Sequence, residues 1–172
     1  IARFSVFIHS SLIFHTHFFI ISLRNTFRLE NTEIMKNLVI GQSGGPTAVI
    51  NASLYGAVKA FRESGADGHV LGMINGIEGF LADHVMDLST DLSNKELELL
   101  KLTPAAYLGS CRYKLPADLD SEVYPAIFDN FREMNIGYFL YVGGNDSMDT
   151  VDKLSRYAEK IGSDVKFIGI PK

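Results

Sequence analysis

The sequence predicts an α/β fold in which a parallel sheet is covered by helices on both faces. Two observations lead to this prediction. From residue 38 onward, short and nearly continuous apolar runs recur, as in strands that are buried on both faces. These runs alternate with longer segments in which apolar residues recur every three to four positions, which is the period of an amphipathic helix.

Strands are expected at four apolar runs, residues 38–40, 70–74, 138–142 and 165–170. Glycine-rich segments between the elements are expected to be loops, among them residues 75–79. Because the carboxyl ends of parallel strands meet at one edge of a Rossmann-like sheet, the segments 41–47, 143–147 and 171–172 are expected to converge on one ligand site.

The first helix is expected to follow the turn at 41–47 and to end at a left-handed cap, Gly65. One face of this helix is apolar and consists of Ile50, Leu54, Ala57, Val58 and Phe61. Ser93 and Glu96 have the spacing of a capping box, which predicts a short helix up to Lys101. Two further helices are expected at residues 120–134 and 149–161.

Composition excludes several classes of protein. The 172 residues, 47% apolar and 21% charged, suffice for one globular domain with a real core. A net charge of −4 argues against nucleic-acid binding, which needs a basic face. Anions remain possible ligands, since backbone N–H groups and a metal ion can hold phosphate. The single cysteine, Cys111, forms no internal disulfide, which fits the cytoplasm, and it is expected to be a packed side chain more than a catalytic thiol.

Residues 1–34 differ from the rest of the chain. Residues 4–23 contain no Asp, Glu, Lys or Arg and could span a bilayer in length. The pattern changes at Met35, so residues 1–34 are expected to be an extension outside the enzyme fold, and no membrane association is expected. The alternatives are a membrane anchor and a metal site formed by His9, His15 and His17. Because the last strand ends just before Lys172, residues 35–172 are interpreted as a domain truncated at its carboxyl end.

Three segments carry the chemistry. The first, Gly41-x-Ser43-Gly44-Gly45-x-Thr47, joins a strand to a helix; its glycines let the backbone approach an anion, although a tight turn would have the same composition. The second is Gly143-Gly144-Asn145-Asp146-Ser147, in which Asn145 or Asp146 can place an oxygen on Mg²⁺. The alternative is that Asp146 or Ser147 caps the following helix.

The third segment is Gly109-Ser110-Cys111-Arg112-Tyr113-Lys114. Its arginine suits bidentate contact with phosphate and stabilisation of charge during phosphoryl transfer. The alternative is a solvated arginine on the surface.

In this order, and together with Asn51 and the final Pro171-Lys172, the three segments resemble the phosphofructokinase family from Met35 to Lys172. The resemblance implies a cytoplasmic glycolytic enzyme that phosphorylates fructose 6-phosphate at its 1-position with Mg²⁺, and that forms a homo-oligomer when complete. It implies catalytic roles for Arg112, Asp146 and Lys172. It places the donor on Gly44, Gly45, Arg112, Tyr113, Gly144, Asn145 and Ser147, with Asn145 as the metal ligand.

The resemblance also bears on the phosphoryl donor. ATP-using members have glycine where this chain has Asp146, and a small residue where it has Lys172. A side chain at 146 takes up room that a nucleoside would need, and its charge repels a phosphate by ~1–4 kcal/mol at 4 Å. Both differences favour pyrophosphate over ATP, and Lys172 is expected to balance the charge of Asp146. Asn145 replaces a metal-binding Asp, which weakens the attraction to Mg²⁺.

The resemblance places the catalytic base in a Thr-Ile-Asp-Asn-Asp segment that is not among these 172 residues. The chain by itself is therefore expected to show no turnover. Two alternatives stay open: an ATP-dependent phosphofructokinase, and an inactive fragment or non-catalytic module that binds phosphate or nucleotide.

Overall fold

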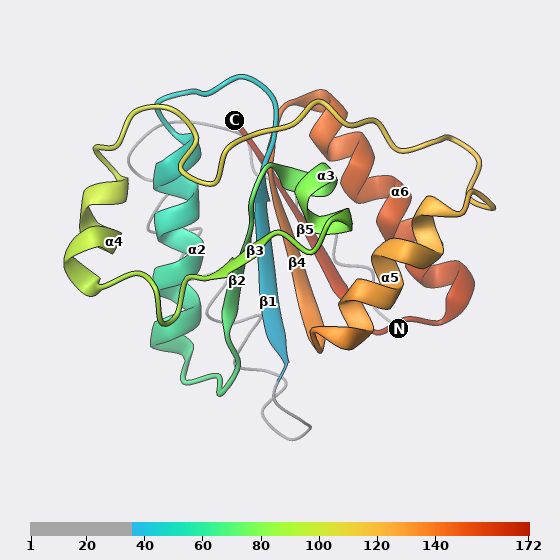
Figure 1. Cartoon of the computed structure of the whole chain (residues 1–172), viewed down its shortest axis with the longest axis horizontal. Helices are drawn as coiled ribbons and strands as arrows, with labels where there is room; N and C mark the ends of the chain where they lie inside the picture. Colours follow the sequence, from blue (N-terminus) through green and yellow to red (C-terminus); the bar gives the residue numbers. More distant parts are fainter. Residues whose placement is uncertain (1–35) are drawn as a thin grey trace.

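The computed structural model describes residues 36–172, so the predicted extension at 1–34, with its three histidines, lies outside the described residues. Within residues 36–172, five strands and five helices follow one another, and Figure 1 shows them as one central sheet between helices. The strands are β1 (Asn37–Gln42), β2 (Val70–Met73), β3 (Val85–Asp87), β4 (Ile136–Gly143) and β5 (Lys166–Pro171). The helices are α2 (Ile50–Ser64), α3 (Gly76–Leu81), α4 (Asn94–Leu100), α5 (Val123–Glu133) and α6 (Asn145–Ile161).

The sheet has the order β3-β2-β1-β4-β5, and all its pairings are parallel except that of β3 with β2. The prediction of a parallel α/β sheet is therefore confirmed for the four strands that were expected. Strand β3 was missed because three residues are too short to give an apolar run. It runs antiparallel because the short helix α3 reverses the chain immediately after β2.

Helices α2 and α4 cover one face of the sheet (Figure 1). The predicted apolar face of α2 is buried, with Ile50, Leu54 and Phe61 at most 1% exposed. The helix ends at Gly65, whose φ of 77° is left-handed as expected. Ser93 and Glu96 form the predicted capping box of α4. These contacts fix the position of α2 and therefore of the loop that leads into it from β1.

Helices α3, α5 and α6 cover the other face, where the core is rich in aromatic rings. Phe131 of α5 contacts Phe139 of β4 and Phe167 of β5, with ring centroids 5.6 and 6.1 Å apart. Edge-to-face and tilted aromatic pairs of this kind stabilise a core beyond the area that they bury. Helix α5 is thereby held against β4 and β5.

Two element boundaries differ from the prediction. The segment 75–79, expected to be a loop, contains the start of α3, with Asn75 left-handed at φ 59° just before it. Helix α6 begins at Asn145, not at residue 149. In both places glycine and polar residues resemble a loop in sequence, yet they are tolerated in a helix's first turn. Among residues 36–172, no helix is long and apolar enough to cross a bilayer.

Candidate phosphate site

The carboxyl ends of β1, β4 and β5 lie side by side, and the segments that follow them are bonded to one another. The N–H of Ser43 donates to the carbonyl of Val142 at 2.9 Å, which ties the loop after β1 to the end of β4. The N–H of Lys172 donates to the carbonyl of Gly143 at 3.1 Å, which ties the end of β5 to the same place. The segments 41–47, 143–147 and 171–172 therefore meet at the carboxyl ends of the strands, as predicted.

The loop after β1 presents glycine backbone. Gly44 has a φ of 74°, which favours glycine, and its N–H donates to the Cys111 carbonyl at 3.2 Å. Gly45 is exposed, and no atom lies within 4 Å of the place where a Cβ would stand. Helix α2 begins only at Ile50, so its dipole reaches these glycines less than the sequence suggested. What Gly45 offers a ligand is an open stretch of backbone.

The loop after β4 combines close packing with an open helix end. A Cβ on Gly143 would collide with the Ser147 side chain and would stand 3.1 Å from the Ser43 carbonyl oxygen. Ser147 is only 3% exposed, so its side chain faces inward to Gly143. Gly144 is different, because a Cβ there would meet nothing within 4 Å. The space in front of Gly144 is open to a ligand.

Helix α6 begins directly after Gly144, so its N-terminus borders that open space. Gly144 is its N-cap residue in extended conformation, and no side chain caps the helix. The alternative that Asp146 or Ser147 acts as the cap is therefore wrong. A helix of 17 residues directs partial positive charge and N–H groups from its first turn, which is a general anion-binding arrangement. Asn145 and Asp146 are exposed in this first turn.

The segment 109–114 is joined to the loop after β1. The hydroxyl of Ser110 donates to the Gly44 carbonyl at 2.5 Å, and the hydroxyl of Ser43 donates to the Cys111 carbonyl at 3.3 Å. Cys111 is 6% exposed, and its Sγ lies 3.7 Å from the Tyr141 hydroxyl, as expected for a packed thiol. Burial raises the pKa of Tyr141, so this phenol stays neutral.

Arg112 and Tyr113 lie just beyond these bonds. Arg112 is exposed, and within residues 36–172 its side chain makes no hydrogen bond or ion pair. Its guanidinium is therefore available to a ligand. Tyr113 is half-buried and packs against the aromatic core beneath the site. This packing anchors the segment 109–114 on the core. Tyr113 therefore has a structural contact, and its predicted role at the donor stays a prediction.

Two buried side-chain amides support this segment from behind. Gln42 donates to Asn51 at 3.0 Å and accepts from the N–H of Leu108 at 2.9 Å. Asn51 donates to the carbonyls of Thr103 and Ala105, both at 2.8 Å. Sequence reasoning noted Asn51 only through the resemblance and missed Gln42. The sequence signal for Gln42 was its place directly after an apolar strand. A polar side chain there is buried, and a buried amide needs hydrogen-bond partners from another segment.

The charged side chains do not pair as the sequence suggested. Lys114 lies 3.3 Å from the Asp146 carboxylate, between Nζ and Oδ1. The ammonium of Lys172 instead donates to the Gly45 carbonyl, above the glycines after β1. The expectation that Lys172 balances Asp146 is therefore wrong. The Lys172 side chain is bonded to the loop after β1, whereas the Lys114 side chain lies beside the first turn of α6. Burial lowers the pKa of Lys172.

A metal ion would find few side-chain ligands here. Among the described residues, no three His, Cys, Asp or Glu side chains form a metal-binding group. The exposed amide oxygen of Asn145 can still contribute one ligand to Mg²⁺, which commonly takes one or two protein oxygens and completes its shell with phosphate and water. The residues present therefore fit an ion that arrives with a phosphate donor.

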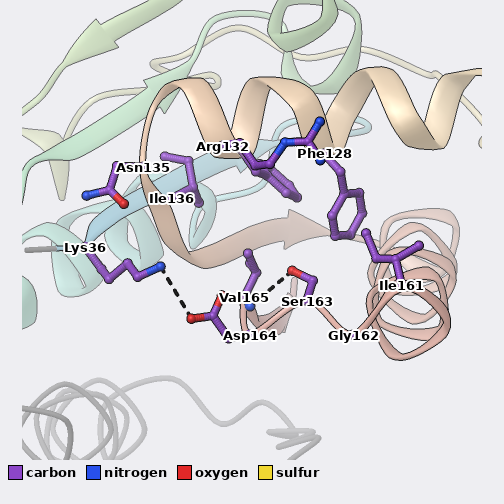
Figure 2. A pocket seen from close by; sticks show the side chains of 11 residues that line it. Lys36, Phe128, Arg132, Asn135, Ile136, Ile161, Gly162, Ser163, Asp164 and Val165 are labelled. Carbon is purple, nitrogen blue, oxygen red and sulfur yellow. Dashed lines mark hydrogen bonds and ion pairs between the residues drawn. The ribbon is translucent and has the colours of Figure 1, made fainter. Parts of the chain in front are cut away.

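A separate hollow of about 400 Å³ lies at the opposite edge of the sheet (Figure 2). It is lined at the starts of three strands by Lys36, Ile136 and Val165, and Lys36 extends toward Asp164 at 3.4 Å. Because it lies at the amino ends of the strands, it contains none of the predicted site residues.

The fold defines the class as an α/β protein, and its candidate anion site, at the carboxyl ends of the strands, consists of glycine backbone, a helix N-terminus and flanking cations. The family described as phosphofructokinase matches residues 37–172, and the chain belongs to it.

Similar proteins agree with this assignment. The chain is 42% identical to the pyrophosphate–fructose 6-phosphate 1-phosphotransferase of Halomonas elongata and 40% identical to that of Rhodospirillum rubrum, over 79% and 78% of this chain. The crystal structure of the pyrophosphate-dependent phosphofructokinase from Nitrosospira multiformis matches with a TM-score of 0.74 at 38% identity, over 81% of this chain and 34% of that one. The chain spans about a third of its curated relatives, 33% and 32% of these two.

Proposed function

We propose that the protein containing this chain transfers a phosphoryl group from pyrophosphate to the 1-position of fructose 6-phosphate. The observation that carries this proposal is the position of Asp146 in the first turn of α6, beside an uncapped helix end that can receive a phosphate. The relatives at 40–42% identity, whose names state pyrophosphate and fructose 6-phosphate, support the same reaction.

In this proposal the chain supplies the donor half of the active site. Gly45 and Gly144 offer backbone to the phosphates, because nothing lies within 4 Å of the place where a Cβ would stand on either residue. Gly44 shapes the loop between them, since its N–H and its carbonyl are both bonded to the segment 109–114. The N-terminus of α6 attracts one phosphate through its dipole. Arg112, exposed and at the end of an anchored segment, adds a fixed positive charge that stabilises the charge developing during transfer.

Mg²⁺ is the proposed metal, with Asn145 as its ligand from this chain. A bound Mg²⁺ supplies Lewis-acid stabilisation of the phosphoryl oxygens. The amide of Asn145 offers a neutral oxygen in place of a carboxylate, so the phosphates themselves would provide most of the attraction to the metal. Lys172 lies over the same glycines and would add positive charge near the phosphates.

The donor choice is proposed from Asp146. Its side chain is 73% exposed and comes from the first turn of α6, where it pairs with Lys114. A pyrophosphate ends at its second phosphorus, whereas ATP continues into an α-phosphate and a nucleoside that must pass this region. A side chain at 146 therefore excludes the larger donor on steric grounds.

The test uses the complete gene product. We expect formation of fructose 1,6-bisphosphate from fructose 6-phosphate with pyrophosphate and Mg²⁺, and at least tenfold lower kcat/KM with ATP, equivalent to about 1.4 kcal/mol. Activity with ATP alone would show that the donor is wrong and that the site is an ATP-dependent one. The absence of turnover with either donor, together with measurable pyrophosphate binding, would favour a non-catalytic phosphate-binding module.

A further inference from the structure

The ion pair between Lys114 and Asp146 joins two segments that border the proposed donor site. Lys114 comes from the segment that carries Arg112, and Asp146 comes from the first turn of α6. Their charged atoms are 3.3 Å apart, and the side chains are 71% and 73% exposed. Ion pairs this exposed contribute little to the stability of a fold. The pair is therefore expected to act on the charge of the donor site more than on the stability of the fold.

Asp146 presents an electrostatic difficulty for any phosphate donor. An unpaired carboxylate in front of the α6 N-terminus repels pyrophosphate as well as ATP, because both are polyanions. Its charge alone would thus weaken donor binding without selecting between donors. Selection needs the volume of the side chain to stay while its charge is compensated. The ammonium of Lys114 is placed to provide that compensation.

Lys172, the other lysine near the site, does not compensate the charge of Asp146. Its ammonium donates to the Gly45 carbonyl, on the β1 side of the site. Its Nζ lies 3.6 Å from the place where a Cβ on Gly44 would stand. Lys172 is thereby committed to the glycines after β1, and Lys114 is the cation that contacts Asp146.

We propose that Lys114 is a specificity-determining positioning residue: by pairing with Asp146 it removes the repulsion that pyrophosphate would otherwise meet, while the pair occupies the space that a nucleoside would need. This inference rests on the proposed function. It assigns donor selection to a pair that bridges two segments and not to Asp146 alone. The two side chains then act as one unit, so the effects of removing them depend on each other.

A double-mutant cycle on the complete gene product tests the proposal. In Lys114→Gln the carboxylate loses its partner, and we expect the KM for pyrophosphate to rise roughly five- to tenfold while kcat changes by less than about twofold. In the Asp146→Asn background the same Lys114→Gln change should alter the KM by less than about twofold. Lys114→Arg should keep the wild-type KM, since it keeps the charge. The rise in Lys114→Gln should shrink in about 0.5 M salt.

The matched control is Lys160→Gln, which removes the ion pair between Lys160 and Asp120 at the far end of α6 and should leave the KM unchanged. The melting temperature of each variant checks folding. An equal rise in KM from Lys114→Gln in the wild-type and the Asp146→Asn backgrounds would overturn the inference and indicate a direct contact with the donor. No rise in either background would overturn it too. A wild type inactive with pyrophosphate would instead overturn the proposed function and this inference with it.

Discussion

The side-chain amide of Gln42 donates a hydrogen bond to the side-chain oxygen of Asn51 at 3.0 Å, and both residues are buried beneath the candidate site. The same oxygen of Asn51 accepts from the N–H of Tyr107 at 2.9 Å. The pair thus connects the end of β1 and the first turn of α2 to the segment that leads to Arg112. The position of the arginine therefore depends on two buried side chains beneath the site.

Asn51→Leu is expected to destabilise the protein by about 2–4 kcal/mol, because the buried amide of Gln42 and the part-buried backbone groups of the segment 103–107 lose their partner. The free energy of unfolding in urea measures this loss. The matched control is Asn94→Ala on the exposed start of α4, where the change should be below about 1 kcal/mol. Equal losses in the two variants would contradict the role given to Asn51.

Much of the fold could be predicted because burial and periodicity are local signals. The face of α2 and the strands β1, β2, β4 and β5 are visible in the order of apolar residues. Strand β3 and helix α3 could not be found that way, since each is short and is held by its neighbours. The partner of Asp146 was also beyond reach, because Lys114 is distant in sequence and only the packing of the segment 109–114 brings it to α6.

Gly143→Ala is expected to destabilise the protein by roughly 1–3 kcal/mol, because the added methyl group collides with the Ser147 side chain and crowds the Ser43 carbonyl. Gly144→Ala is the matched control: it adds the same methyl group one residue later, where nothing lies within 4 Å, and φ is −85°. Its change in unfolding free energy should be below about 0.5 kcal/mol. If the two variants unfold alike, the close packing at Gly143 does not determine the loop.

The double variant Asp146→Gly with Lys172→Gly is expected to gain use of ATP, because it removes two side chains that border the region a nucleoside would need: Asp146 in the first turn of α6 and Lys172 over the glycines after β1. We expect kcat/KM with ATP to rise at least about tenfold, equivalent to about 1.4 kcal/mol. Both donors are assayed in parallel with fructose 6-phosphate, using the complete gene product. An unchanged value with ATP would mean that Asp146 and Lys172 do not choose the donor.

Arg112→Lys is expected to lower kcat with pyrophosphate about 100-fold or more, because an ammonium cannot reproduce two parallel hydrogen bonds to a phosphate. Arg112 is exposed and makes no bond within the described residues, so the melting temperature should stay the same. Arg156→Lys, an equally conservative change on the exposed side of α6, serves as the control and should leave kcat as it is. If Arg112→Lys lowers the melting temperature together with kcat, Arg112 has a structural role instead.

The 172-residue chain, purified without further sequence, is expected to bind pyrophosphate and yet to form no fructose 1,6-bisphosphate. Binding requires the glycine backbone, the α6 N-terminus and Arg112, all of which residues 36–172 contain. Transfer also requires a base to accept the proton of the sugar hydroxyl, and Asp146, the acidic side chain in the first turn of α6, is paired with Lys114. Calorimetric titration with pyrophosphate and a product assay separate the two steps. Turnover by this chain would show that the base lies within these residues, and the absence of binding would show that the donor site itself is incomplete.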